Sequence, residues 1–155
     1  MIWLRGDIKN TNVWDFGLKV DLPHRTDTTD IRVRYAETDA MGWVYYANYL
    51  AYFEVGRTEL IRKVWRPYRT LEDEGLRLPV IEAGCRYRQG ARYDDVLTIQ
   101  TQITLPTSYR IRFDYEIRRA SAAELIADGF TEHCFVGDQG RPVRIPADLR
   151  AVLTA

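Results

Sequence analysis

The sequence predicts an α+β domain in which an antiparallel sheet of five or six strands wraps around one long central helix. Three observations predict this arrangement. The apolar residues change their period from two to about 3.6 near residue 46, and they keep the helical period to residue 65. Four strand-like runs follow residue 77. Short polar connections separate these runs, which favours antiparallel pairing between consecutive strands.

The segment before the helix is predicted to be a strand that ends in a tight loop. Ile31, Val33 and Tyr35 alternate with polar residues, so Tyr35 would share a face of the strand with Val33 and could line a pocket. Asp39 and Gly42 follow in the loop, where Gly42 permits backbone conformations that a Cβ resists.

The first 29 residues are predicted to be an N-terminal extension to a domain that spans residues 30–155. Partial alternation between Trp14 and Val20 favours an edge strand or a cover for a neighbouring subunit, and the alternative is a mobile extension. Residues 23–30 are crowded with Pro, His, Thr and Asp, which is typical of a linker.

The long helix is predicted to span residues 46–65 and to end before Pro67. Arg57 projects close to the centre of its apolar stripe, so its charge needs a partner, which Glu54 or Glu82 could supply. We interpret Arg57 as structural because it lies several turns from the loop. The predicted stripe consists of Tyr46, Tyr49, Leu50, Phe53, Leu60, Ile61 and Val64.

The remaining elements are short. A helical turn is predicted at Thr70–Glu74, and a last helix begins at Pro146 and ends near Val152. The four strands between them are predicted at Leu78–Arg88, Arg92–Leu105, Ser108–Arg119 and Glu124–Val136.

The composition argues against several classes of function. The 22 Lys and Arg residues balance the 22 Asp and Glu residues, so nothing in the charge favours nucleic acid or a membrane surface. No apolar run reaches transmembrane length and the N-terminus lacks the regions of a signal peptide, so we expect a cytoplasmic protein. Cys85 and Cys134 lie far from any metal-ligand spacing, and we expect free thiols, no metal and no cofactor.

Common hydrolase and nucleotide motifs are also missing from the sequence. The only histidines are His24 and His133, and His133 lies on a strand pattern without a G-x-S-x-G elbow, so a Ser-His-Asp hydrolase is disfavoured. Neither G-x-x-x-x-G-K-(S/T) nor G-x-G-x-x-G occurs. We interpret His133 as a core or interface residue.

The loop itself carries the strongest chemical indication. Asp39 lies just before a helix start, where the Tyr45 and Tyr46 amides lack helical acceptors and could hold a developing oxyanion. Asp39 would then face the carbon of an activated carbonyl. The alternative is that Asp39 serves only as a turn residue or as an anion at the helix start.

The same stretch resembles a known signature. TDAMGWVYYANYLAYFEVGRTELIR is similar to the D-x-x-G-x-V-(Y/F)-(Y/H)-x-x-Y pattern of the acyl-CoA thioesterases related to 4-hydroxybenzoyl-CoA thioesterase, which have the hotdog fold. The likeness continues through residues 79–103 and 141–149 and begins near residue 30. Two positions depart from it: Tyr46 stands where many relatives have His, and Gly90 where they often have Pro or Ser.

The resemblance implies hydrolysis of an acyl-CoA thioester without a cofactor. It places Asp39 as nucleophile or general base and Tyr46 beside it, with Gly42, Tyr45 and Tyr35 around the substrate. The segment that resembles the family's CoA-contacting region adds Ser108, Arg110 and Arg112. It also implies a homodimer or homotetramer with active sites at the dimer interface. A non-catalytic module that binds acyl-CoA is the alternative.

Overall fold

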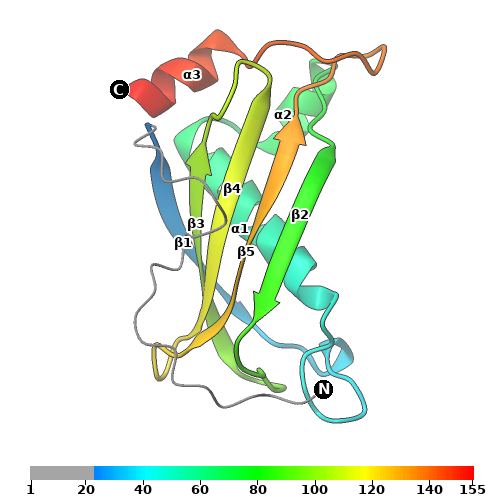
Figure 1. The fold of residues 1–155 in the computed structure, drawn as a ribbon, viewed down its shortest axis with the longest axis vertical. Helices are drawn as coiled ribbons and strands as arrows, with labels where there is room; N and C mark the ends of the chain where they lie inside the picture. The colour runs from blue at the N-terminus through cyan, green and yellow to red at the C-terminus, as the bar shows by residue number, and fades with distance from the viewer. Residues whose placement is uncertain (1–22) are drawn as a thin grey trace.

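The computed structural model describes residues 23–155. In this part of the chain the strands are β1 (Arg25–Arg32), β2 (Val80–Tyr87), β3 (Val96–Thr104), β4 (Arg110–Arg119) and β5 (Leu125–Cys134). The helices are α1 (Asn48–Val64), α2 (Tyr68–Asp73) and α3 (Ala147–Thr154), and a 3-10 turn η1 spans Tyr35–Glu37. The strands form one antiparallel sheet in the order β1-β3-β4-β5-β2, and α1 lies across one face of it (Figure 1). The predicted α+β class and central helix are confirmed.

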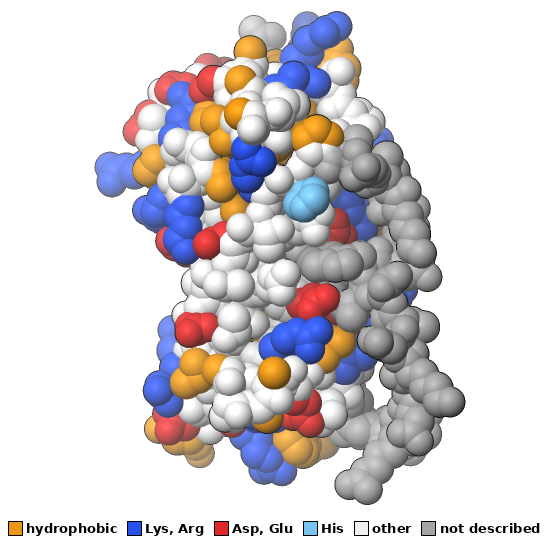
Figure 2. All heavy atoms as spheres, turned by 90° about the vertical axis from the view of Figure 1, so that its left-hand side faces the viewer, with side chains coloured by type: hydrophobic (Ala, Val, Ile, Leu, Met, Phe, Trp, Pro, Cys, Tyr) orange, Lys and Arg blue, Asp and Glu red, His pale blue; other side chains and the backbone are white. Residues whose placement is uncertain are grey.

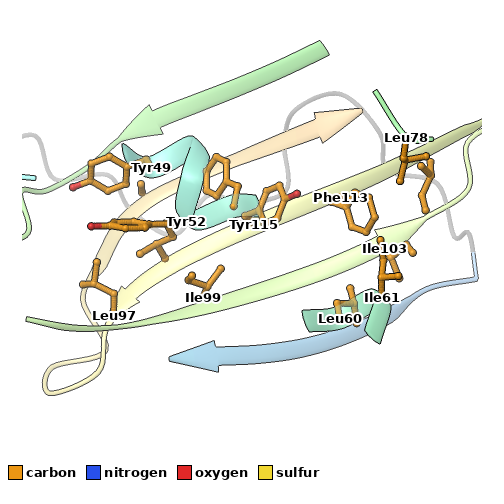
Figure 3. Packing of buried hydrophobic residues seen from close by; sticks show 14 of the residues in the cluster. Tyr49, Tyr52, Leu60, Ile61, Leu78, Leu97, Ile99, Ile103, Phe113 and Tyr115 are labelled. Atoms are coloured by element: carbon orange, nitrogen blue, oxygen red, sulfur yellow. The ribbon is translucent and has the colours of Figure 1, made fainter. Parts of the chain in front are cut away.

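Helix α1 buries an aromatic and aliphatic face against the sheet. Figure 3 shows Tyr52, Leu60 and Ile61 of α1 directed toward the sheet, and the Tyr49 ring packs against Tyr87 of β2 with 5.3 Å between centroids. The ring of Phe53 stacks on Tyr115 with 4.3 Å between centroids and 8° between planes. Burying rings of this size supplies a large share of the hydrophobic stabilisation.

The predicted stripe is wrong at two of its seven positions. Tyr46 is 52% exposed because it precedes the first helical residue, and Leu50 is 44% exposed because it faces away from the sheet. Tyr52 and Gly56 are buried in their place. A Cβ at Gly56 would lie only 2.8 Å from Ile99 Cγ2, so the glycine permits the close approach of α1 to β3.

The strand order differs from the predicted one at β2. Consecutive pairing holds for β3 with β4 and for β4 with β5, but β2 pairs with β5 instead of β3. The segment from Arg88 to Asp95 does not form a hairpin. It crosses the end of the sheet, where Gln89 N–H donates to Ile126 O and the Arg119 guanidinium to Gly90 O. This crossing leaves β3 free to pair with β1.

The N-terminal boundaries also differ from the prediction. β1 begins at Arg25, inside the segment predicted as a linker, and it pairs with β3 at the edge of the sheet. It ends at Arg32, so Tyr35 is not on a strand: the chain leaves the sheet and enters η1. The predicted edge strand between Trp14 and Val20 lies outside the described residues, and so does the rest of residues 1–22.

The sheet face opposite α1 is charged rather than apolar. Its arginines alternate with carboxylates and form ion pairs with them: Arg110 with Glu132, Arg112 with Asp114, Arg118 with Glu116, and Arg88 with Asp128. Figure 2, which views the β1 side, shows basic and acidic side chains likewise interspersed.

None of the helices in residues 23–155 is long and apolar enough to span a membrane.

Two buried polar groups lie beneath α1. His133 is fully buried on β5, where Nδ1 is 3.0 Å from Leu78 O and Nε2 is 2.9 Å from Thr131 Oγ1. Arg57 is 12% exposed and lies 3.9 Å from Glu54, which confirms the predicted burial and identifies its partner. Because Glu54 is 68% exposed, the pair is a weak one.

Candidate active site

The loop between η1 and α1 is closed by the Asp39 side chain. One carboxylate oxygen, Oδ1, accepts from the Met41 amide at 2.8 Å and the Trp43 amide at 3.3 Å, and the Asp39 amide donates to Trp43 O at 2.8 Å. Gly42 adopts a φ of +77°, as the loop requires and as the sequence predicted. One of the two carboxylate oxygens of Asp39, Oδ1, therefore serves to close the turn.

The second oxygen of Asp39 is differently placed. Oδ2 accepts no hydrogen bond from any residue that the structure describes, and the side chain is half-buried. A carboxylate with one oxygen fixed and the other open has a defined orientation and a free lone pair. Those are the two properties that a nucleophile or general base needs.

The segment from Arg88 to Asp95, which crosses the end of the sheet, packs against the loop. Val44 N–H donates to Ala91 O at 2.9 Å, and the Trp43 ring lies against Gly90, where a Cβ would overlap it. The Arg92 guanidinium also packs on the indole, with its Cζ 3.9 Å from the ring centroid. This packing explains why a glycine stands at position 90: the indole occupies the space that a larger residue would take.

The start of α1 presents free amides, one position later than predicted. The Tyr45 amide is not one of them, because it donates to Glu37 O at 2.8 Å. The helix begins at Asn48, and the Tyr46 and Ala47 amides donate to no acceptor among residues 23–155. Tyr46 N–H remains a candidate oxyanion donor, and Ala47 N–H joins it.

Tyrosines surround this helix start. The rings of Tyr45 and Tyr46 are 4.6 Å apart, and Tyr87 on β2 donates its hydroxyl to Tyr46 O at 3.1 Å. Burial raises the pKa values of Tyr49 and Tyr87 to about 12, so both stay protonated at neutral pH. Tyr46 carries a phenol where many relatives have an imidazole, and its backbone amide is the group that we retain as a candidate donor.

Cys85 lies beside these tyrosines but is a poor nucleophile. It is a free thiol, as is Cys134. Burial raises the pKa of Cys85 to about 12, which leaves almost no thiolate. Among the described residues no group of three or more His, Cys, Asp or Glu side chains could hold a metal ion.

Glu37 is a residue of the site that sequence reasoning missed. Its side chain is 11% exposed and accepts from the Arg34 amide at 2.7 Å and the Tyr52 hydroxyl at 2.9 Å. Burial alone would raise the pKa of Glu37, but the hydrogen bonds from Arg34 and Tyr52 outweigh it and lower the pKa. The Arg34 and Glu37 spacing of three residues was the available signal, and the strand predicted through Tyr35 concealed it.

A pocket of about 330 Å³ opens beside Glu37, between the end of β1 and the first turns of α1. Asp39 does not line it. The lining residues are Ile31, Arg32, Arg34, Glu37, Ala51, Tyr52 and Val55.

Tyr35 lies on η1 and is exposed to solvent. It is 78% exposed on η1 and packs edge to face with Tyr93, with 5.6 Å between the ring centroids. It is not among the residues that line the pocket beside Glu37. Its predicted place on a strand face is wrong because β1 ends three residues earlier.

The predicted CoA-contacting residues lie at the other end of the sheet. Ser108 and Arg110 are at the start of β4, whereas Arg119 at its end contacts Gly90 beneath the Asp39 loop. Nine residues of strand separate Arg110 from Arg119, which is about 30 Å. One chain therefore does not bring Ser108, Arg110 and Arg112 together with Asp39: the turn before β4 and the loop before α1 lie at opposite ends of the sheet (Figure 1).

Comparisons with known proteins identify relatives of this fold and loop. Residues 33–153 match the family model described as the thioesterase-like superfamily. The acyl-CoA thioesterase YbgC of Haemophilus influenzae is 32% identical over 124 residues, covering 78% of this chain and 89% of its own. The crystal structure of the hypothetical protein TT1821 from Thermus thermophilus superposes with a TM-score of 0.77 at 35% identity, covering 82% of this chain and 96% of its own.

A third comparison confirms the fold named from the sequence. A 4-hydroxybenzoyl CoA thioesterase variant in complex with 4-hydroxybenzoyl CoA superposes with a TM-score of 0.75 at 22% identity, covering 83% of this chain and 99% of its own. At that identity the likeness shows the fold alone, which is the hotdog arrangement of a sheet around one helix. The family match covers most of this chain, and the chain belongs to the thioesterase-like superfamily.

Proposed function

We propose that this protein hydrolyses an acyl-CoA thioester to the free acid and CoA. The observation that carries the proposal is the loop geometry: Asp39 has one oxygen fixed by loop amides and one open, and the free Tyr46 and Ala47 amides follow it within eight residues. A thioester carbonyl needs a group that attacks or activates water and donors for the oxyanion. The loop and helix start supply both.

Two routes use the same carboxylate. In the first, Asp39 Oδ2 attacks the carbonyl carbon, CoA thiolate leaves, and water hydrolyses the mixed anhydride. In the second, Asp39 takes a proton from water as the water attacks the carbon directly. The Tyr46 and Ala47 amides stabilise the oxyanion in either route.

The proposal includes a homodimer formed along β2. Through β5, the Val80 end of β2 is in register with Ile111 of β4, beside Arg110 and Arg112, and the Tyr87 end contacts Tyr46. Antiparallel pairing of two β2 strands about a two-fold axis would bring the first end of one chain beside the second end of its partner. That supports a site in which Arg110, Arg112 and Ser108 of one copy hold the CoA of a thioester bound at Asp39 of the other.

A panel of acyl-CoA thioesters tests the proposal. Aryl, short-chain and long-chain thioesters are incubated with the protein, and free thiol is followed with a chromogenic disulfide. We expect turnover of at least one class that Asp39→Asn lowers. Binding of the whole panel without any release of thiol would instead favour the non-catalytic acyl-CoA-binding module.

Isotope labelling separates the two routes. In a single turnover in ¹⁸O water, hydrolysis of an anhydride can leave ¹⁸O in the Asp39 carboxylate, and general base catalysis cannot. Mass spectrometry of the peptide that carries Asp39 gives the answer. Label in the peptide establishes the nucleophile route, whereas label confined to the acid product excludes attack of water at the Asp39 carbon of an anhydride and fits the base route.

A further inference from the structure

We propose that Glu37 is the positioning residue that fixes the Asp39 carboxylate relative to the amides at the start of α1. This inference rests on the proposed thioester hydrolysis and concerns the same site. It is drawn from hydrogen bonds that the carboxylate and the backbone carbonyl of Glu37 accept from three segments of the chain.

The side chain of Glu37 joins η1 to the second turn of α1. Oε2 accepts from the Arg34 amide at 2.7 Å and from the Tyr52 hydroxyl at 2.9 Å. Oε1 accepts from Nε and Nη2 of Arg34 at 3.0 Å and 2.8 Å. Tyr52 is only 4% exposed and is packed against the ring of Tyr49, so the helix end of this contact is rigid.

The backbone of Glu37 joins the same turn to the residues at the start of α1. Its carbonyl oxygen accepts from the Tyr45 amide and from Nδ2 of Asn48, both at 2.8 Å. The Tyr45 amide precedes the free Tyr46 amide by one residue, so this contact sets the direction of the candidate oxyanion donor. Asp39 follows Glu37 by two residues, so the same residue sets the path of the chain into the Asp39 turn.

We call these hydrogen bonds of the Glu37 side chain and carbonyl the Glu37 clamp. Their loss should affect turnover more than substrate binding. The carboxylate and the amide act on opposite sides of one reacting carbonyl, and a displacement near 1 Å between such groups can lower a rate by about 10²-fold. Contacts to the rest of the acyl-CoA should be unchanged in Glu37→Gln, because Gln keeps the size and shape of the side chain that lines the pocket. We therefore expect loss of Glu37 to lower kcat and to leave KM nearly constant.

The test measures kcat and KM for Glu37→Gln with the panel thioester that the wild type turns over fastest. We expect kcat to fall at least about ten-fold with KM within about two-fold. Glu116→Gln is the matched control: Glu116 has an 8% exposed side chain and accepts from Arg118 at 2.8 Å, but on β4 and away from the loop. Its kcat should match that of the wild type.

The same substitution in an Asp39→Asn background distinguishes positioning from general loss of structure. If Glu37 acts through Asp39, the effect of Glu37→Gln on residual turnover should shrink to less than about three-fold. If Glu37→Gln lowered turnover by the same factor in the wild type and in Asp39→Asn, the inference would be overturned. An unchanged kcat in the Glu37→Gln single variant would also overturn it. If Glu37→Gln does not fold, Tyr52→Phe removes one donor and is read by the same criteria, with a loss of at least about three-fold expected.

Hydrogen exchange gives a readout that does not depend on activity. Loss of the clamp should accelerate exchange of the Tyr45 amide at least about ten-fold while amides of β3 and β4 keep their rates. If the wild type and Asp39→Asn turn over equally, the proposed function fails and the exchange rates still report whether Glu37 holds the helix start. Unchanged exchange at Tyr45 in Glu37→Gln would overturn the clamp itself.

Discussion

At Gly90, the Trp43 ring fills the space that a Cβ would occupy. Gly90→Ala should therefore destabilise the protein by about 1–3 kcal/mol, since the indole would have to shift and lose part of its contact with Arg92. Trp43→Leu frees that space, so in its background the same change should cost less than about 0.5 kcal/mol. Urea unfolding of the four proteins measures both values. An equal cost in the two backgrounds would show that the indole is not the obstacle.

Arg57 illustrates how far single residues could be predicted. Its burial follows from the helical period, because 100° per residue places it close to the centre of the stripe. Its partner does not follow, because Glu54 and Glu82 were both within reach on sequence grounds. The structure places Glu54 at 3.9 Å and mostly in solvent. Removing Arg57 therefore leaves no buried carboxylate, and the cost is that of lost packing rather than of a stranded charge.

At the scale of elements, α1 covers a histidine that is neutral in the folded protein. Burial lowers the pKa of His133 to about 4 from its ordinary value of 6.5. Above pH 6.5 neither the folded nor the unfolded state binds this proton. Between pH 6.5 and 4 only the unfolded state binds it, so the free energy of unfolding falls as pH decreases through this range.

Comparison with His133→Gln isolates this contribution from that of the carboxylates. Between pH 7 and pH 4.5 the wild type should lose roughly 2–3 kcal/mol more stability than the variant, at about 1.4 kcal/mol per pH unit. Denaturant unfolding at the two pH values measures the difference. Equal losses in the two proteins would mean that His133 is protonated or exposed in the fold.

Most elements were predictable because local patterns determine them. The switch of apolar period fixed α1 to within two residues of its start, and alternation located β3, β4 and β5 to within four residues at each end. The wrong predictions concern segments whose conformation is determined by tertiary contacts rather than by local sequence. Residues 25–30 are polar, yet they form β1 because β3 offers them a pairing edge. Tyr35 continues the alternation of β1 but leaves the sheet, since Arg34 and Glu37 bond to each other.

At the scale of the whole molecule, no strand among residues 23–155 pairs with the outer edge of β2. This eight-residue strand carries exposed Val80 and Ile81, 52% and 47% exposed, and edges of this kind pair with another chain. We expect a homodimer through β2, and Ile81→Lys should shift it toward monomer and lower turnover together. Leu50→Lys, on the exposed face of α1, should keep the dimer and report any further association into a tetramer.

Light scattering over a dilution series, combined with the thioester assay, measures both effects. A wild-type monomer with full activity would contradict a site shared between chains. The residues of such a site could be read from the sequence only through resemblance, because Arg110 lies at the end of β4 opposite to Arg119, which contacts the segment beneath the Asp39 loop, and no local pattern relates Arg110 to Asp39. Glu37, in contrast, lies only two residues from Asp39 in the sequence, but its proposed role could be inferred only from its hydrogen bonds in the structure.

The central claim is that the open oxygen of Asp39 performs the chemistry. Asp39→Asn retains the shape of the turn, because the amide oxygen can still accept from Met41 and Trp43, and it removes the basicity of the second position. The most direct measurement is single-turnover hydrolysis of the preferred thioester by this variant, alongside its Kd for the same compound. The account predicts a rate at least about 10²-fold lower with Kd nearly unchanged. A rate close to that of the wild type would contradict it and leave Asp39 as a turn residue alone.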